Sequence, residues 1–293
     1  MREPGARDGA TDGLLVFVRT GQLARELARR APAARLVGRD EADLTDPAAC
    51  VALIRAARPA AVINAAAYTA VDRAESEPDL ARLVNAETPG AMAAACAAQD
   101  IPFLHVSTDY VFDGSGDTPR TESAATGPLG TYGRTKLEGE RAIAAAGGQW
   151  AVMRTSWVFS AHGQNFVRTM RQLGRERARL SVVADQVGGP TPAADIAAAL
   201  LTMARAMRCD PGRRGLWHFA GHPDVSWAGI ARENYARSGL ATEVAGIPTR
   251  DYPAPARRPA NSRLDCAAIT RDFGIVRPDW RKGPDRIIEE LNA

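Results

Sequence analysis

Three side chains in the middle of the sequence could together move a proton to or from a carbonyl/alcohol pair. Tyr132 and Lys136 are four residues apart, so on a helix they lie on one face, about one turn apart. A lysine in that place favours the phenolate and lowers a tyrosine pKa that is normally about 10. Thr108 offers a hydroxyl that could hold a carbonyl oxygen beside the phenol. The three residues therefore predict a general acid–base site.

The position of this pair matters, because a tyrosine and a lysine at this spacing also occur together by chance. Thr108 ends the apolar segment PFLHVST (102–108), and Tyr132 follows at the start of a helical stretch, YGRTKLEGERAIAAA (132–146). Ligands of parallel α/β sheets bind at the carboxyl ends of the strands. A hydroxyl at a strand end, followed by this helix, favours the catalytic interpretation.

The rest of the chain must supply the elements that position these residues. The strand-like apolar segments are 14–18, 34–38, 60–67, 102–108 and 150–159, and the helical segments are 21–31, 46–59, 78–100 and 132–146. Strands that alternate with helices predict a parallel sheet covered on both faces. We therefore expect an α/β fold with a Rossmann-type, doubly wound parallel sheet.

The alternation also predicts a division of the chain. Residues 1–12 are polar and predict a flexible leader, and residues 13–160 predict a dinucleotide-binding domain. After residue 160 the pattern loosens, and we expect residues 161–293 to form mainly a smaller C-terminal α/β substrate domain. This domain should be discontinuous, because segments near 181–221 are expected to return to the large domain.

Composition and charge exclude several classes of function. A net charge of +3 on 293 residues gives no reason to expect nucleic acid as a partner. No apolar run approaches the roughly 20 residues of a membrane span, and the N-terminus lacks the apolar core of a signal peptide. We expect a cytoplasmic protein without a membrane partner. Four widely spaced cysteines predict free thiols rather than a zinc site or disulfides: Cys50, Cys96, Cys209 and Cys266.

The stretch VFVRTGQLARE (16–26) has the strand, turn and helix that hold a pyrophosphate in dinucleotide-binding proteins. The three fingerprint positions are Val18, Gly21 and Ala24, so a single glycine remains. Alanine is an accepted variant at the third position. If the turn needs a positive φ at Val18, the valine is strained by about 1–2 kcal/mol. If residue 18 is still extended, the valine simply fits. The expected cofactor residues of this loop are Thr20, Gly21, Gln22 and Leu23.

Two further strand ends predict cofactor contacts. The small residues Ala65, Ala66 and Ala67, followed by Thr69, come after the third strand, where a ribose and the nicotinamide linkage would pass. Arg39, after the second strand, could meet a 2′-phosphate, which favours NADPH and leaves NADH possible. Arg19 is a second candidate for that phosphate. Both arginines could equally be solvated surface residues.

Beyond these residues the chain resembles a known family. The Tyr-x-x-x-Lys helix resembles that of the extended short-chain dehydrogenase/reductases, and the finer pattern is similar to the dTDP-4-dehydrorhamnose reductase family. The matching stretches are RTGQLARE (19–26), EADLTD (41–46), VINAAAYTAVDRAESEP (62–78), HVSTDYVFDG (105–114), PLGTYGRTKLEGE (128–140), RTSWVFSAHGQNFVRTM (154–170), VVADQVGGPT (182–191), HFAG (218–221) and SRLD (262–265).

The resemblance implies a reaction and a role for each of the three residues. A nicotinamide hydride would reduce C4 of dTDP-4-dehydro-L-rhamnose to give dTDP-L-rhamnose, the last step of dTDP-rhamnose synthesis. Tyr132 would donate the proton, and Lys136 would tune Tyr132 and bind the nicotinamide ribose. Thr108 would hydrogen-bond the sugar oxygen at the reacting centre. Asp43 and Leu44 match positions near the adenine.

The resemblance also implies substrate contacts. Trp157 matches a tryptophan that contacts the sugar nucleotide, and a core tryptophan is the alternative. Asp109, Val111 and Phe112 would line the same pocket. Weaker candidates for the nucleotide end are Asn165, Gln186 and Arg258.

No metal is predicted, and the four histidines are assigned no catalytic role. Some family members are described with magnesium bound by glutamates at a dimer interface, but the sequence places no such site. His105 and His218 lie in predicted strands and are interpreted as packing residues. We expect a monomer or a homodimer that binds a dTDP-sugar.

Two alternative functions remain at this stage. One is another dTDP-sugar 4-ketoreductase or epimerase of the same superfamily. The other is a non-catalytic, NADP-binding regulatory subunit, which the presence of Thr108, Tyr132 and Lys136 argues against.

Overall fold

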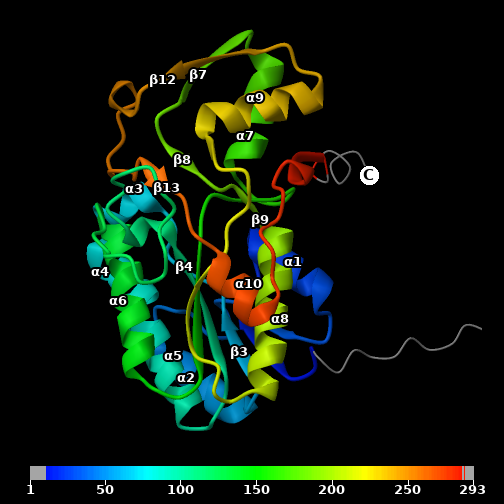
Figure 1. The fold of residues 1–293 in the computed structure, drawn as a ribbon. Coiled ribbons are helices and arrows are strands. Elements are labelled where there is room, and N and C mark those ends of the chain that lie inside the picture. Colours follow the sequence, from blue (N-terminus) through cyan, green and yellow to red (C-terminus); the bar gives the residue numbers. More distant parts are fainter. Residues whose placement is uncertain (1–10, 286, 288–293) are drawn as a thin grey trace, which may run out of the picture.

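The large lobe of the protein is built on a six-stranded parallel sheet (Figure 1). The computed structural model describes residues 11–285 and residue 287. The strand order is β10-β5-β4-β3-β1-β2. The bounds are β1 Leu14–Phe17, β2 Arg35–Val37, β3 Ala61–Asn64, β4 Phe103–Thr108, β5 Trp150–Thr155 and β10 Gly215–His218. The first five strands lie within the five predicted apolar segments. Four of them are buried along almost their whole length, as strands covered on both faces are, and the edge strand β2 is partly exposed.

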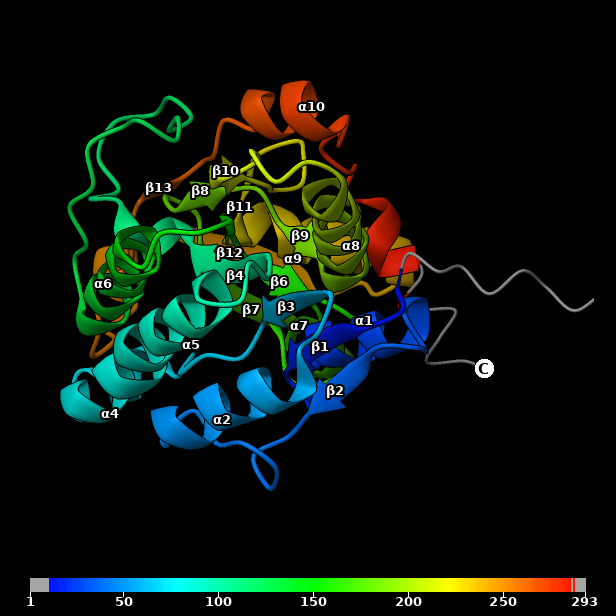
Figure 2. The same ribbon diagram turned by 90° about the horizontal axis from the view of Figure 1, so that it is seen from below.

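Helices cover both faces of this sheet, as a doubly wound fold requires (Figure 2). One face packs against α1 (Gln22–Arg30) and α8 (Ala193–Cys209). The other packs against α2 (Pro47–Ala57), α5 (Thr88–Ala97) and α6 (Thr131–Ala145). The α/β prediction is therefore confirmed.

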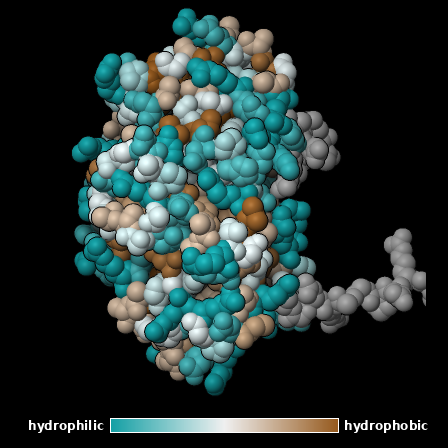
Figure 3. Space-filling model, viewed as in Figure 1, coloured by the Kyte–Doolittle hydropathy of each residue, from teal (hydrophilic) through white to brown (hydrophobic). Residues whose placement is uncertain are grey.

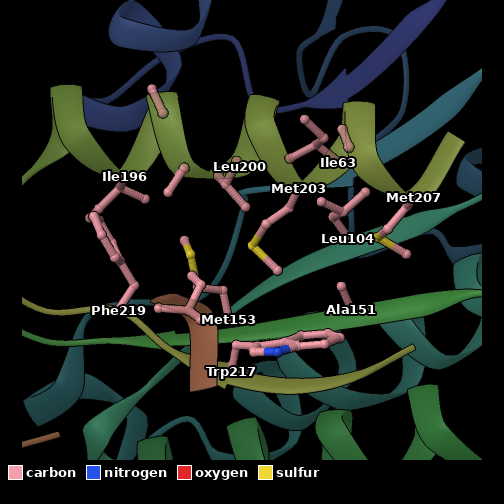
Figure 4. Close-up of a cluster of buried hydrophobic side chains, with 14 of the residues drawn as sticks. Ile63, Leu104, Ala151, Met153, Ile196, Leu200, Met203, Met207, Trp217 and Phe219 are labelled. Atoms are coloured by element: carbon pink, nitrogen blue, oxygen red, sulfur yellow. The ribbon is translucent and has the colours of Figure 1, made fainter. Parts of the chain in front are cut away.

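The core between α8 and the sheet is apolar throughout (Figure 4). Ile196, Leu200 and Met203 are fully buried on α8, and they point towards Leu104 and Met153 of the sheet. Burying a side chain of this size stabilises a fold by about 1.5–3 kcal/mol. This packing joins α8 to the central strands of the sheet.

The predicted helix 78–100 is present but interrupted. Its parts are α4 (Pro78–Arg82), a π-helical turn at Leu83–Glu87 and α5. The π turn ends two residues before Pro89, which has no N–H for the regular helical bond. The turn places Asn85 against the loop that follows β3.

The smaller lobe contains α7 (Phe166–Glu176), α9 (Trp227–Ser238) and a parallel pair of strands, β7 (Arg179–Val183) and β12 (Glu243–Ile247). It has its own apolar cluster, in which Met170 and Tyr235 are buried. Short strands lie between the lobes: β6 Val158–Phe159, β8 Val187–Gly188, β9 Thr191–Pro192, β11 Val225–Ser226 and β13 Asn261–Ser262. The remaining short helices are α3 Val71–Ala74, the 3-10 turns Asp109–Val111 and Thr249–Asp251, and α10 Ala267–Phe273.

The chain crosses between the lobes more than once. After the small-lobe strand β7 it returns to the large sheet through α8 and β10, within residues 193–218. It then re-enters the small lobe with α9. Residues 1–10 of the expected leader lie outside the described residues.

The visible face in Figure 3 is mostly polar, with small separate apolar areas. None of the helices in the described part of the chain is long and apolar enough to cross a membrane. All four cysteines are free, as predicted, and Cys209 alone among them is exposed. Within residues 11–285 and 287, no group of three or more histidine, cysteine or acidic residues is arranged to hold a metal ion.

Candidate active site

Thr108 and Tyr132 come from two elements that pack closely at the carboxyl end of the sheet. Thr108 ends β4, and its Oγ1 accepts a hydrogen bond from the backbone N–H of Tyr110 at 3.2 Å. Tyr132 begins the first turn of α6. A Cβ on Gly133 would lie 2.2 Å from the carbonyl oxygen of Tyr110, so only glycine permits this approach. The glycine therefore brings Tyr132 next to Thr108.

The start of α6 is fixed by a side chain that the sequence analysis missed. Glu75, just after α3, accepts hydrogen bonds from the backbone N–H of Thr131 at 2.7 Å and from its hydroxyl at 2.9 Å. A carboxylate at this end satisfies a free N–H group and complements the helix dipole. Glu75 thereby orients the turn that carries Tyr132. It caps the helix across 56 residues of chain, which no local pattern reveals.

The phenol of Tyr132 is held in its protonated form. Burial raises the pKa of Tyr132 to about 12, and the hydrogen-bonded hydroxyl of Thr108 only partly opposes this rise. The ring of Tyr110 packs edge-on against Tyr132, with the centroids 5.5 Å apart. The phenol of Tyr132 therefore keeps its proton near neutral pH, next to the hydroxyl of Thr108.

Lys136 lies one turn beyond Tyr132, as predicted, but its ammonium group contacts other residues. Nζ donates to the carbonyl oxygen of Val106 at 2.7 Å and lies 2.8 Å from His105 Nε2. Burial lowers the pKa of Lys136 to about 7. The expected lowering of the Tyr132 pKa by Lys136 is not found, and Nζ contacts two residues of β4 instead.

Asp109 has a buried carboxyl group beside Thr108. The side chain is 2% exposed, and Oδ2 has no hydrogen-bond partner among the described residues. Burial raises the pKa of Asp109 to about 7, against the opposing effect of the nearby hydroxyls of Ser262 and Thr108. An unsatisfied buried carboxyl at the end of β4 is suited to a hydroxyl-bearing ligand.

The loop between β1 and α1 has the features of a phosphate-binding turn. Gly21 has φ of +102°, and a Cβ built on it would meet nothing within 4 Å. No side chain caps α1, so its first N–H groups are available to an anion. Thr20 and Gly21 are exposed, and Gln22 and Leu23 are partly exposed.

Val18 is not strained, which resolves the two possibilities left by the sequence. It is absent from the described residues with positive φ, and its side chain packs against the core. The conformation that needs glycine occurs at Gly21 instead. Ala24 is fully buried, where a small side chain lets α1 approach the sheet.

The two arginines near β2 have different surroundings. Arg19 forms ion pairs with Asp40 and Glu41. Arg39 is exposed and makes no ion pair with any residue of the described part of the chain. Nearby, Asp43 accepts a hydrogen bond from the backbone of Thr45. Arg39 is thus the arginine at this strand end whose charge is available to a ligand.

The loop after β3 presents small, partly exposed residues, Ala65, Ala66 and Ala67, before the exposed Thr69. Asn85 holds this loop by two hydrogen bonds with the backbone of Tyr68, at 2.9 and 3.1 Å. Leu44, in the loop between β2 and α2, is buried, and its carbonyl oxygen accepts from Thr88 at 2.6 Å. The predicted cofactor positions therefore share the carboxyl edge of the sheet.

Trp157 stacks on a tryptophan of the smaller lobe. Its ring lies 3.8 Å from that of Trp227, and its backbone has φ of +49°, a conformation that non-glycine residues rarely adopt. Gln186 accepts from Nε1 of Trp227 at 3.1 Å and donates to Thr249. The partly exposed Trp157 is not a core tryptophan, and Gln186 supports it indirectly.

Arg258 and Asn165 link segments that are distant in sequence. Arg258 donates to Asp72 Oδ2 at 2.7 Å, and its charge lies close enough to Tyr110 to affect the pKa of that phenol. The C-terminal loop therefore reaches Tyr110, whose ring packs against Tyr132. Asn165 caps α7 and donates to the side chain of Gln22 at 3.0 Å, so it lies on the cofactor loop side.

Comparisons with known proteins show the family of the chain. Residues 12–293 match the family described as RmlD substrate binding domain. The chain is 43% identical to dTDP-4-dehydrorhamnose reductase of Sinorhizobium fredii, over 95% of this chain and 97% of that protein. It is 39% identical to the Escherichia coli protein of the same name, over 95% and 97%.

The chain belongs to the dTDP-4-dehydrorhamnose reductase family. Solved structures of this family are also similar. The Clostridium acetobutylicum reductase has a TM-score of 0.89 at 33% identity, covering 96% of this chain and 99% of that one. The Bacillus anthracis reductase, solved in complex with NADP, has a TM-score of 0.86 at 30% identity, covering 94% and 98%. Both matches extend over the two lobes.

Val111 and Phe112, which the family resemblance placed in the pocket, are 0% and 1% exposed and belong to the core beneath β4. Their contact with a ligand stays a prediction. Two residues of this reductase family member that sequence reasoning missed are Glu75 and Trp227. Each acts on a partner distant in sequence, which leaves no local pattern to find.

Proposed function

We propose that this protein reduces the C4 keto group of dTDP-4-dehydro-L-rhamnose to give dTDP-L-rhamnose, with NADPH as the hydride donor and NADH as a possible substitute. The observation that carries the proposal is the pairing of two hydroxyls, Thr108 and Tyr132, at the carboxyl end of β4. The pair offers one donor that orients a carbonyl oxygen and one acid that protonates it. Family membership supports the choice of sugar nucleotide.

In the proposed mechanism, the chain's own residues position the keto oxygen and supply its proton. Thr108 donates a hydrogen bond to O4 of the sugar, beside the phenol of Tyr132. Tyr132 then gives its proton to O4 as C4 becomes a secondary alcohol. Because burial keeps the pKa of Tyr132 high, the phenol is fully protonated before the step. Lys136, in its ammonium form, stabilises the phenolate that remains.

The cofactor site fits a dinucleotide. The uncapped N-terminus of α1 and the open approach at Gly21 suit a pyrophosphate, and exposed Arg39 suits a 2′-phosphate. The partly exposed residues after β3 would lie along a ribose. When bound, NADPH supplies the hydride that reduces C4.

In the proposed complex, the substrate would contact residues of several segments. Trp157 would contact the sugar nucleotide, and Asp109 would pair its free carboxyl oxygen with a sugar hydroxyl. Arg258 would be oriented by Asp72 towards the diphosphate. We also propose that the enzyme works in the cytoplasm as a monomer or homodimer.

The test follows nicotinamide absorbance with enzymatically prepared dTDP-4-dehydro-L-rhamnose. We expect Tyr132→Phe to lower kcat by about 10²–10⁴-fold while NADPH still binds. Tyr110→Phe is the matched control, because it removes a neighbouring phenol hydroxyl and should retain most of the activity. Turnover in Tyr132→Phe equal to that of the wild type would contradict the assigned acid.

A panel of substrates separates the alternatives. A regulatory subunit would bind NADPH without turning over any sugar nucleotide. Another ketoreductase or epimerase would prefer a different dTDP-sugar under the same conditions. The proposal expects dTDP-4-dehydro-L-rhamnose to have the highest kcat/KM of the panel.

A further inference from the structure

A chain of buried polar side chains runs from β3 through β4 to α6, behind the acid–base pair. Asn64 Nδ2 lies 3.2 Å from His105 Nδ1, and His105 Nε2 lies 2.8 Å from Lys136 Nζ. Each of the three side chains is at most 1% exposed. Their polar atoms must therefore satisfy one another, and the arrangement of protons along the chain can be derived.

The amide of Asn64 fixes the tautomer of His105. Asn64 Oδ1 accepts a hydrogen bond from the backbone N–H of Ala66 at 3.2 Å, which directs the amide NH₂ towards the histidine. An amide NH₂ can only donate, so His105 Nδ1 must accept. Complete burial lowers the pKa of His105 well below its usual value, so the ring is neutral. Its single proton is therefore on Nε2.

The proton on His105 Nε2 points at Nζ of Lys136. An ammonium group has three donors and no acceptor, so it would face the Nε2–H of His105 donor to donor. A neutral amine has a lone pair that accepts this proton, and it can still donate to the carbonyl oxygen of Val106. With Lys136 as a neutral amine, the hydrogen bonds from Asn64 to His105, from His105 to Lys136 and from Lys136 to Val106 all have one donor and one acceptor.

The other groups around Lys136 do not reverse this preference. Glu140, one turn further along α6, favours the ammonium form by charge. Its oxygens are already paired with Arg154 of β5, at 2.6 and 2.9 Å, and accept from Ser107 of β4. Tyr132, on the same helix, is uncharged near neutral pH. Asn64, on β3, carries no charge and so does not favour either form of Lys136 by charge.

We propose that His105, oriented by Asn64, is a positioning residue that stabilises the neutral amine of Lys136 and so sets the pH at which this lysine takes up its proton. The effect of this protonation on the rate of reduction rests on the proposed function. The ammonium form stabilises the phenolate left by Tyr132, so reduction should slow as the pH rises through the pKa of Lys136. His105 does not relay protons to solvent, because Asn64 at the far end is fully buried.

The amino-acid composition makes a direct test possible. The chain has two lysines, Lys136 and Lys282, and Lys282 is exposed. In a Lys282→Arg background, ¹³C-labelled lysine gives signals from Lys136 alone. A titration of the full-length protein from about pH 5 to 10 then reads the protonation of Lys136 without any turnover. We expect a midpoint of about 7.

His105→Gln is the decisive variant. A glutamine side chain can turn its carbonyl oxygen towards Nζ and accept from the ammonium form. We expect the midpoint to rise by about one pH unit or more, a tenfold gain in proton affinity. The alkaline limb of the NADPH-dependent reduction should move in the same direction. A midpoint that stays within about 0.3 pH units of the wild type would overturn the proposal, because a purely structural histidine would leave it there.

A second measurement needs no variant at His105, in case the substitution prevents folding. Long-range ¹⁵N spectra of histidine-labelled wild-type protein distinguish the two neutral tautomers, and variants of the other three histidines assign the signals. We expect the Nε2–H form for His105, and the Nδ1–H form would overturn the proposal. Both measurements are made without sugar substrate. An enzyme that failed to reduce the dTDP-sugar would refute the proposed function and leave this test intact.

Discussion

The indole ring of Trp157 lies flat on that of Trp227, with centroids 3.8 Å apart and planes 16° apart. The contact joins the end of the large sheet to α9 of the smaller lobe, and a hydrogen bond from Trp227 to Gln186 orients it. The stack thereby holds Trp157, whose backbone has a positive φ of 49°, in one position. Such strain persists only where the surroundings hold it, and it is concentrated at functional sites.

The first prediction concerns this stack. Trp227→Leu removes an aromatic pair worth about 0.5–1.5 kcal/mol, so we expect the KM for the sugar nucleotide to rise about two- to tenfold. Trp227→Phe is the control, because it keeps a ring against Trp157. Its KM for the sugar nucleotide should lie between those of the wild type and Trp227→Leu. Steady-state kinetics at saturating NADPH measure the effect. A change confined to kcat would show that the stack does not position the substrate.

The second prediction concerns cofactor choice. Arg39→Ala removes the unpaired charge at the end of β2, and loss of a charge-assisted hydrogen bond costs about 1.5–3 kcal/mol. We expect the Kd for NADPH to rise at least tenfold while that for NADH changes little. Arg19→Ala is the matched control, because Arg19 is already engaged by Asp40 and Glu41. Fluorescence titration of the wild type and both variants with each cofactor measures the six dissociation constants. Equal losses for NADPH and NADH would place the 2′-phosphate elsewhere.

The third prediction concerns Val18. Because its backbone is unstrained and its side chain packs on the core, Val18→Gly should destabilise the protein by about 1–2 kcal/mol and leave the Kd for NADPH unchanged. Urea unfolding and cofactor titration measure the two effects. Tighter NADPH binding in the variant would show instead that the valine side chain obstructs the cofactor.

The fourth prediction concerns stability and pH. Burial raises the pKa of Asp109 from about 4 in the unfolded chain to about 7 in the fold, so the unfolded state loses its proton first. As the pH rises from about 4 to 7, the folded state loses stability progressively. Asp109→Asn removes this loss, and we expect the variant to gain stability over the wild type at pH 8 but not at pH 4.

Thermal unfolding at a series of pH values measures that difference. Asp117→Asn, at an exposed position, is the control and should follow the wild type. A difference between Asp109→Asn and the wild type that does not vary with pH would contradict the prediction.

Several features could be read from the sequence because they are local. Apolar runs buried on both faces predict parallel strands whatever their partners are, so the five early strands and the α/β class followed directly. The spacing of Tyr132 and Lys136 places them on one face of any helix. The position of Thr108 at a strand end needed no more than the length of its apolar run.

The tertiary structure alone decided how these residues act on one another. Lys136 shares a helix face with Tyr132, yet its amine bonds to His105 and Val106, because burial rewards a satisfied hydrogen bond wherever one is within reach. His105 was interpreted from its strand as a packing residue, and its contact with Lys136 could not be foreseen. Glu75 caps α6 although it lies 56 residues earlier in the chain, so this contact could not be foreseen either. Sequence patterns specify the elements, whereas charge states and hydrogen-bond partners depend on which elements meet in the fold.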